Sequence, residues 1–380
     1  MANILSNLAA DIYKAADVVG RELVGFIPSI TINAGSERAA LNDVVRSAFT
    51  RPATVVTPTP SMTIPEGTDQ TVDSKTLTVD TPLSVQIPWT GEDIKHVNNG
   101  AGFETIYGDQ LRQAMRAIVN SIEASVALAA KRGSSRAYGT AGTTPFASNF
   151  NELPQLRKIM EDNGCPFDGM TSVVMNTSAG ANLRSLAILQ KANEAGGTDL
   201  LRQGTLLDLM GFMLKQSAGI VSHTKGGGAS YVTSGSTAVG VTDIALVTGT
   251  GTVLAGDVVT FAADTVNKYV VNTGVAAPGT ISLGAPGAQV VIATANALTV
   301  GNSYTPNIAL HKSAIELAMR PMAEPAGGDA AVDSMIVQDP WSGLVFEIRA
   351  YKGYKKAMFD VSCVTGVKTW KPNHIATLIG

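Results

Sequence analysis

The sequence predicts an α+β fold in which an all-β module interrupts a mixed α/β host. The first observation is a loss of charge: only four of the 81 residues from Gly226 to Pro306 are charged, about 5%, against 16% for the whole chain. The second is a long helical pattern over 104–132, and the third is a stretch at 51–89 rich in proline and threonine. These features predict a long hairpin, a long helix, an α/β domain and a β-rich insert, in that order.

Composition bounds the class of protein. The chain has 380 residues, a formal net charge of −3 and a pI of about 5.8, enough for two or three domains and without the clustered basic residues of a tight nucleic-acid binder. No apolar run reaches the roughly 18–20 residues of a membrane span. Charged residues from Asp11 to Asp17 interrupt the apolar start, so we expect no signal peptide. Cys165 and Cys363 are too few for a disulfide framework, and we expect two reduced thiols in a soluble protein made in the cytoplasm.

Residues 1–50 are predicted to form an N-terminal arm. Their apolar residues fall mostly at helical spacing. These are Ile4, Leu8, Ile12, Val19, Leu23 and Phe26. An arm that docks on a neighbouring molecule and an ordinary first helix both fit this pattern.

Residues 51–90 are predicted to form an extended hairpin. Prolines from Pro52 to Pro65 exclude helix, and Glu66–Gln70 forms a polar tip. Apolar residues then alternate with polar ones up to Trp89, the period of a strand. A hairpin with so few large apolar residues has no core of its own, so we expect it to pack on a partner surface.

Residues 91–150 are predicted to hold the longest helix. Apolar residues step by three or four along one face, namely Leu111, Met115, Ile118, Ile122, Val126 and Ala129. Gly133 ends the pattern, and Lys131 and Arg132 complement the helix dipole in the last turn. A helix over 104–132 would be about 40 Å long, and we expect it to pack on the C-terminal sheet.

Residues 151–221 read as an α/β domain. A helix started by Pro154 leads to a strand at Ser172–Met175, and Asn176, Thr177 or Ser178 can cap the helix that follows. Gly196 and Gly197 mark a loop, and an apolar segment follows at Leu206–Leu214.

Residues 222–306 are predicted to form an independent domain resembling a β-barrel. An inserted domain enters and leaves its host at one place, so we expect its two ends to lie close together. Residues 307–380 then return to the host. There Ile308–Arg320 is a strand or helix pair, residues 344–363 form two strands of a β meander, and Ile375–Ile379 is a last strand.

The search for catalytic chemistry finds no convergent set of residues. The four histidines are scattered and read as turn, surface or core residues; they are His96, His223, His311 and His374. The glycines at 249–256 precede a strand rather than the helix a dinucleotide loop requires, and Gly366–Thr369 lacks the upstream glycine of a phosphate loop. Gly256–Asp257 reads as a turn. We therefore assign no catalytic, cofactor-binding or metal-binding residue and expect no enzyme.

The order of elements resembles the major capsid protein fold of tailed phages and herpesviruses. Two local stretches strengthen the likeness. Ile308–Pro321 resembles the segment after the insert in such coat proteins, and Leu254–Phe261 resembles a strand of the β-barrel insertion domain of short-tailed phage coat proteins. The resemblance implies an N-arm, an extended loop, a spine helix, and axial and peripheral domains with an all-β insertion domain.

The resemblance also implies a function and partners. It implies a structural protein that self-assembles as hexamers and pentamers into an icosahedral shell enclosing double-stranded DNA. The expected partners are other copies, a scaffolding protein during assembly, a portal at one vertex, a decoration protein, and DNA by weak contact, with no membrane. The expected location is the virion capsid, assembled in the host cytoplasm. Some members cross-link a lysine to an asparagine, but a solvated Lys75 and a turn Asn373 explain those residues here, and we assign no cross-link.

Other functions are open from the sequence. A bacterial nanocompartment shell shares the fold, although the insert argues against it. The insert alone would also fit a β-rich adhesin or carbohydrate-binding protein, against which the long helix counts.

Overall fold

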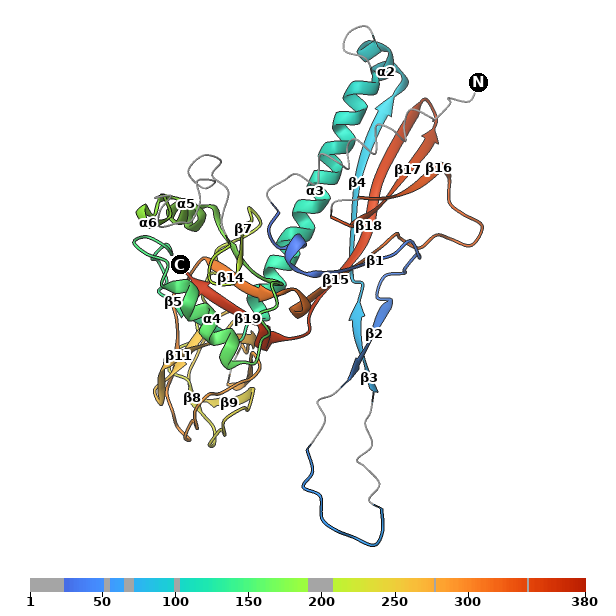
Figure 1. Cartoon of the computed structure of the whole chain (residues 1–380). Helices are drawn as coiled ribbons and strands as arrows, with labels where there is room; N and C mark the ends of the chain where they lie inside the picture. The colour runs from blue at the N-terminus through green and yellow to red at the C-terminus, as the bar shows by residue number, and fades with distance from the viewer. Residues whose placement is uncertain are drawn as a thin grey trace.

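The computed structural model places two β-sheet bodies beside a long helix, with a two-stranded hairpin projecting away from them (Figure 1). The structure describes residues 24–50, 55–64, 72–98, 103–190, 208–276, 278–339 and 342–380. Residues 1–23 of the predicted N-terminal arm, the predicted polar tip and the loop at Gly196–Gly197 lie outside these ranges.

The first body is a sheet of six strands in the described part of the chain, in the order β1-β15-β18-β17-β16 with β4 paired to β18. Their bounds are β1 Thr31–Ala34, β4 Thr81–Thr90, β15 Ile315–Arg320, β16 Ala331–Gln338, β17 Val345–Gly353 and β18 Lys356–Thr369. The predicted meander is confirmed, because β17 returns as antiparallel β18 with Ile348 opposite Val361.

Helix α3 (Phe103–Arg132) confirms the helix predicted at 104–132, and the short α2 (Gly91–Asn98) precedes it. Its apolar face packs against β4 and β18, along which it runs (Figure 1). The residues from Leu111 to Val126 on this face are at most 2% exposed and share one core with Phe346 and Ile348. Tyr107 extends that core, since its ring centroid lies 4.3 Å from that of Phe359. The expected packing on the C-terminal sheet is confirmed.

The chain enters the described core beside this helix. Phe26 is fully buried, and the 3-10 turn η1 (Ile27–Ser29) follows it. The Glu123 carboxylate of α3 accepts hydrogen bonds from the amides of Gly25, Phe26 and Ile27 at 2.8, 2.8 and 3.0 Å. One buried acidic residue thus fixes the start of the described chain on the helix.

The second body has the strand order β7-β6-β14-β19-β5. Its bounds are β5 Arg136–Gly139, β6 Thr171–Met175, β7 Met213–Gln216, β14 Pro306–His311 and β19 Ile375–Ile379, with helices α4 Glu152–Asp162, α5 Thr177–Ser185 and α6 Ala187–Gln190. Every residue of β6 is buried, as expected of a central strand. Asn176 is the cap of α5, since its Oδ1 accepts a hydrogen bond from the Ala179 amide at 2.8 Å. The predicted order of helix, strand and helix is confirmed.

The charge-poor stretch consists of short strands around a separate apolar cluster. They are β8 Val232–Thr233, β9 Asp243–Val247, β10 Val258–Phe261, β11 Asp264–Thr273, β12 Gly279–Leu283 and β13 Leu298–Val300. Its two ends lie side by side, as predicted. The His223 amide donates to the Tyr304 carbonyl at 2.7 Å, and the Tyr304 amide donates back at 3.1 Å.

This stretch also pairs with its host, which the sequence did not predict. Strand β11 pairs with β5, placing Lys268 opposite Ala137, so its strands continue the second sheet. Arg136 adds a hydrogen bond to Asn267 Oδ1 at 3.1 Å. The physical reason is that β5 pairs with β19 on one side only. Without β11, the amides and carbonyls at the other edge of β5 would have no partner strand.

The predicted boundary at residue 150 also needs correction. Strand β5 lies between β19 and β11, so the chain joins the second sheet soon after α3 ends at Arg132. Two further crossings link the sheets, η2 (Lys312–Ala314) between β14 and β15, and η3 (Pro372–His374) between β18 and β19. Ile308–Arg320 was expected to be a pair of strands or of helices, and it forms the strands β14 and β15.

Candidate assembly surfaces

The hairpin is a two-stranded sheet of β2 (Val44–Thr50) and β3 (Val72–Thr78), and the structure pairs neither strand with another sheet. Its strands differ from the predicted ones. The alternating segment Thr81–Thr90 is β4, which pairs with β18 over ten residues in the first body. Alternation along a strand shows which side chains share a face but not which strand lies beside it, so the sequence assigned this segment to the hairpin.

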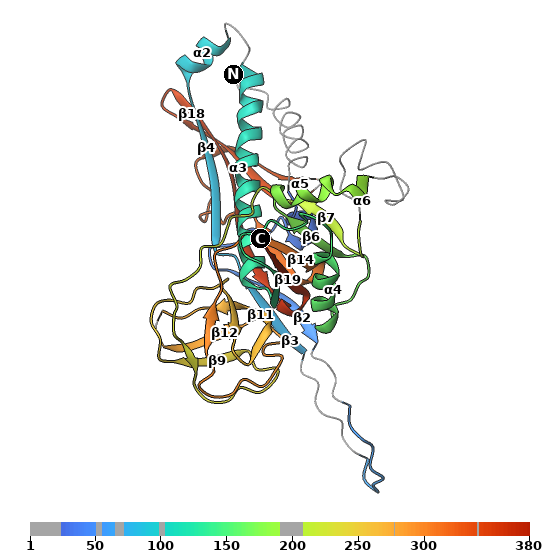
Figure 2. The same cartoon turned by 90° about the vertical axis from the view of Figure 1, so that its left-hand side faces the viewer.

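Beyond the paired strands, the described segment 55–64 projects far from both bodies (Figures 1 and 2). Four of its apolar side chains are almost fully in solvent. Their exposed fractions are 96% for Val55, 70% for Val56, 106% for Met62 and 91% for Ile64. Several large apolar side chains exposed to this degree within one short segment indicate an interaction surface.

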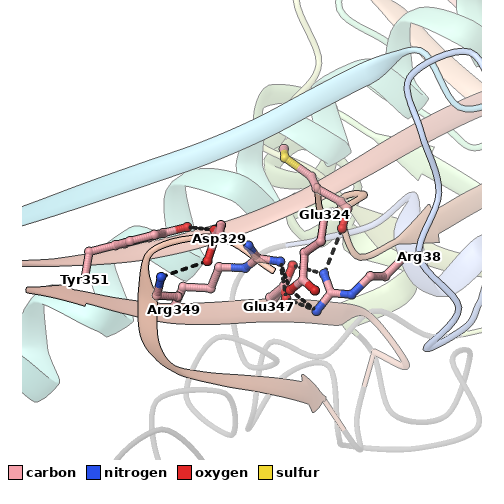
Figure 3. A network of polar contacts seen from close by, with 8 residues as sticks. Arg38, Glu324, Asp329, Glu347, Arg349 and Tyr351 are labelled. Atoms are coloured by element: carbon pink, nitrogen blue, oxygen red, sulfur yellow. Dashed lines mark hydrogen bonds and ion pairs between the residues drawn. The ribbon is translucent and has the colours of Figure 1, made fainter. Parts of the chain in front are cut away.

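An ionic network holds the base of the hairpin (Figure 3). Arg38, which precedes β2, contacts Glu347 Oε1 of β17 and Glu324 Oε1, both at 2.7 Å. Arg349, two residues along β17, contacts Glu324 at 2.5 Å and Glu347 at 2.9 Å. Asp329 completes the network by accepting from Arg349 at 2.5 Å. The network therefore joins the hairpin, the 321–330 loop and the first sheet.

Burial makes this network sensitive to the loss of its two buried members, Glu347 and Arg349. The Glu347 side chain is fully buried and that of Arg349 is 7% exposed. Burial alone would lower the pKa of Arg349, but hydrogen bonds with Glu347 raise it above its ordinary value. A hydrogen bond from Tyr351 is the largest cause that lowers the pKa of Asp329, followed by the Ala331 amide. Several short contacts hold these side chains together, so the network is a fixed joint.

The histidines fall into three surroundings. His96 is exposed on α2. His223 is buried, with Nε2 2.8 Å from Asp257 Oδ1. His311 and His374 meet at the two crossings between the sheets, with ring centroids 5.8 Å apart, and His311 Nε2 lies 3.1 Å from Asp168. His96 therefore lies at the surface, whereas the other three histidines are buried. The two close pairings were not foreseen from the sequence.

The two thiols and the possible metal ligands of the described residues are considered next. Cys165 and Cys363 are free and buried, and burial raises the pKa of these thiols to about 11 and about 12. Over the described ranges, no three His, Cys, Asp or Glu side chains are grouped to hold a metal ion. Among the described helices, none is both long and apolar enough to cross a bilayer.

The four charged residues of the charge-poor stretch all have structural contacts. Asp243 accepts from Ser282, and Lys268 donates to the Gly139 carbonyl. Asp264 accepts from Tyr269 Oη at 2.5 Å. Asp257, fully buried, accepts from the Leu254 amide at 2.7 Å and from the Gly226 amide at 3.0 Å, besides its contact with His223. Asp257 of the predicted turn thus accepts the hydrogen bonds that hold the first residues of this stretch in place. A single aspartate in a sequence with so few charges is the signal that could have revealed this role.

Lys75 and Asn373 each have contacts within the chain. The Lys75 Nζ lies 5.5 Å from the Trp370 ring centroid. Asn373 Nδ2 donates to the Asn163 carbonyl at 3.4 Å, and the Asn373 carbonyl accepts from Asn163 Nδ2 at 3.1 Å. Lys75 is therefore partly buried rather than only solvated, whereas Asn373 lies in the turn η3, as expected.

Comparison with solved structures identifies the fold. A chain of the capsid of cyanophage P-SCSP1u superimposes with a TM-score of 0.52 at 12% sequence identity, covering 94% of this chain and 88% of that one. This chain has the fold of that phage capsid chain. The expected phage capsid fold is thus confirmed in its general form.

Two other solved structures align over a similar length. A chain from Mycobacterium phage Che8 gives a TM-score of 0.48 at 13% identity, covering 93% of this chain and 90% of that one. A chain from the mature capsid of bacteriophage PhiM1 gives 0.47 at 13% identity, covering 93% and 86%. Both of these scores lie below 0.5, so the assignment of the phage capsid fold depends on the similarity to the cyanophage chain. No family model and no curated protein sequence matches the chain.

Proposed function

We propose that this chain is the major capsid protein of a tailed bacteriophage. It self-assembles as hexamers and pentamers into an icosahedral shell around double-stranded DNA, and its place is the virion. The observation that carries the proposal is the exposed apolar segment 55–64, held away from the body of a phage capsid fold.

The physical reason lies in the surface area of this segment. Val55, Val56, Met62 and Ile64 contact water almost fully in the single chain, and burial of such side chains stabilises a protein by roughly 1.5–3 kcal/mol each. The hairpin has no core in which to bury them, so a neighbouring copy is the surface that covers them. A shell repeats this contact in every subunit, and stability follows from the number of copies.

Residues 222–306, which contain the charge-poor stretch, are proposed as the all-β insertion domain of the short-tailed phage coat type. Its separate apolar cluster and its adjacent ends support this assignment. In that role it steers folding of the subunit or contacts neighbouring capsomers. A scaffolding protein, a portal at one vertex and a decoration protein are the further proposed partners.

Electron microscopy of the purified protein tests the proposal. We expect closed particles or hexameric and pentameric rings from the natural chain. A variant with Met62→Ser and Ile64→Ser should keep its melting temperature and fail to form them, because both side chains are exposed in the subunit. A control with Val332→Ser, at an exposed apolar residue of β16, should assemble normally. Particles from the tip variant would show that the hairpin is not an assembly element, and a purified natural chain without any particle would contradict the function.

A further inference from the structure

An apolar groove of about 270 Å³ lies along the second half of α3. The helix contributes Ala124, Ala127 and Leu128, which recur at the spacing of one helix face. Residues 219–221 and the start of β14 also line the groove. Leu128 is 39% exposed and Val221 is 70% exposed, so the described chain leaves apolar surface uncovered here.

The described chain starts beside this groove. Phe26 lines it, and the Gly25 amide donates to the carboxylate of Glu123, the residue directly before Ala124. Residues 1–23, which lie outside the described ranges, are therefore attached next to the groove. A tethered segment has a high effective concentration at such a place, which favours it over a segment of another molecule.

The residues that directly precede the described chain match the groove in length and apolar spacing. Val19 and Leu23 lie four residues apart, as Ala124 and Leu128 do. The small side chains of the two alanines in the groove leave room for larger ones. From Ala124 to Lys131 the helix rises about 10 Å, and a helix over residues 16–23 has the same length.

The charges also match. Lys131 is the one charged side chain among the described residues that line the groove. Burial is the largest influence on the pKa of Lys131 and lowers it, although the charge of Asp257 raises it. With Leu23 placed at Ala124, Asp17 comes close to Lys131 at the other end. A carboxylate there stabilises the charged form of the lysine.

We propose that residues 16–23 bind in this groove of their own chain as a helix antiparallel to α3. The direction follows from the attachment, because the segment must end near Ala124, whereas α3 continues from there to Lys131. The contact covers Leu128 and Val221 in the single subunit. It assigns the N-terminal segment to its own subunit, and it does not depend on the assembly of a shell.

Disulfide formation in the unassembled full-length chain tests the location of the segment. Val19→Cys is combined either with Leu128→Cys, four residues after Ala124, or with Asn120→Cys, four residues before it on the same exposed face. A disulfide needs Cα atoms within about 7 Å of each other, so we expect at least about tenfold more product from the first pair. Both native cysteines are buried and do not compete.

Mass spectrometry of mixed isotope-labelled and unlabelled chains distinguishes the possible occupants of the groove. We expect the disulfide between Val19→Cys and Leu128→Cys within single chains only. Hybrid products would give the groove to the N-terminal segment of a second copy. A disulfide between Leu128→Cys and Met62→Cys of different chains would give it to a neighbouring hairpin. Either result, or equal yields from the pairs with Leu128→Cys and Asn120→Cys, would overturn the inference.

Hydrogen exchange gives a second readout that needs no added cysteine. The amides of residues 16–23 should exchange at least about tenfold more slowly than in an unfolded chain. Leu128→Asp should remove most of this protection, because it places a charge in the apolar groove. Asn120→Asp makes the same kind of change outside the groove and should leave the protection intact. Both side chains are exposed, so both variants should keep the melting temperature of the subunit. Unprotected amides at 16–23 in the natural chain, or equal effects of the two variants, would contradict the proposal.

Discussion

Three buried carboxylates join segments that are far apart in the sequence. Glu123 holds the amides of residues 25–27, Asp257 holds the root of the charge-poor stretch, and Glu347 holds two arginines. Each is satisfied by several donors, which offsets the cost of removing a charge from water. Because the partners are brought together only by the fold, no local pattern in the sequence marks these residues.

Ile118 tests the apolar face of α3 at the level of one side chain. It is 2% exposed in the core shared with the first sheet. We expect Ile118→Asp to lower the free energy of unfolding by about 3–5 kcal/mol, because it buries an unpaired charge. A thermal melt of the unassembled subunit measures the effect.

Asn120→Asp is the matched control, because Asn120 is exposed on the same helix. Asparagine and aspartate also have similar helix propensities. Its melting temperature should stay near that of the natural chain. A normal melt for Ile118→Asp together with failed assembly would place this face at a contact between subunits.

His374 gives a pH dependence whose sign follows from its surroundings. Burial, then the charges of Lys371 and His311, lower its pKa to about 4, against about 6.5 in an unfolded chain. Between these values the unfolded chain binds a proton that the folded chain excludes, so stability is lost as the pH falls. We expect a loss of roughly 2 kcal/mol from this group between pH 7 and pH 4.5, measured by urea unfolding. His374→Gln should remove this part of the pH dependence, and an unchanged profile in that variant would contradict it.

At the scale of elements, the hairpin depends on the ionic network at its base. Glu347→Gln leaves both Arg38 and Arg349 without a fully charged partner inside the sheet. We expect a loss of about 3 kcal/mol or more in the free energy of unfolding. Glu324→Gln makes the same change of charge beside the same two arginines, but its side chain is 30% exposed, so it should cost less than about 1 kcal/mol. Chemical denaturation of both variants compares them, and equal losses would show that burial does not set the strength of the joint.

The charge-poor stretch depends in the same way on Asp257. Asp257→Ala leaves the amides of Gly226 and Leu254 and the ring of His223 without their acceptor. We expect a loss of about 3 kcal/mol, because several buried donors lose their partner. Asp243→Ala, at an exposed residue of β9, should change stability by less than about 1 kcal/mol. Hydrogen exchange should report the loss chiefly in residues 222–306, and uniform loss over the host would contradict a local role.

The elements that the sequence predicted are those with a strong local period. Helix α3 and the strands of the meander belong to this group, because apolar spacing alone determines their type. The hairpin was misjudged because β4 has the same alternation as a hairpin strand, and only its pairing with β18, some 270 residues away, places it in the first body. The ionic network escaped prediction for the same reason, since Arg38 and Glu347 are 309 residues apart.

At the scale of the whole molecule, the chain connects the two sheet bodies at three places. It passes from one body to the other at α3, η2 and η3. The strands of the charge-poor stretch extend the second sheet, because β11 pairs with β5. Composition therefore predicted a separate charge-poor stretch but not its attachment to the second sheet. Composition shows which residue types a segment contains. It does not show that one strand of the segment pairs with β5.

The paired ends at His223 and Tyr304 have a consequence for the history of the gene. A stretch whose entry and exit already touch can be exchanged for another segment without a large movement of the host, provided that β5 stays covered. The pairing of β11 with β5 sets the condition on such an exchange. Any replacement cassette, natural or engineered for display, must bring its own strand to cover β5, or that edge will recruit one from another molecule.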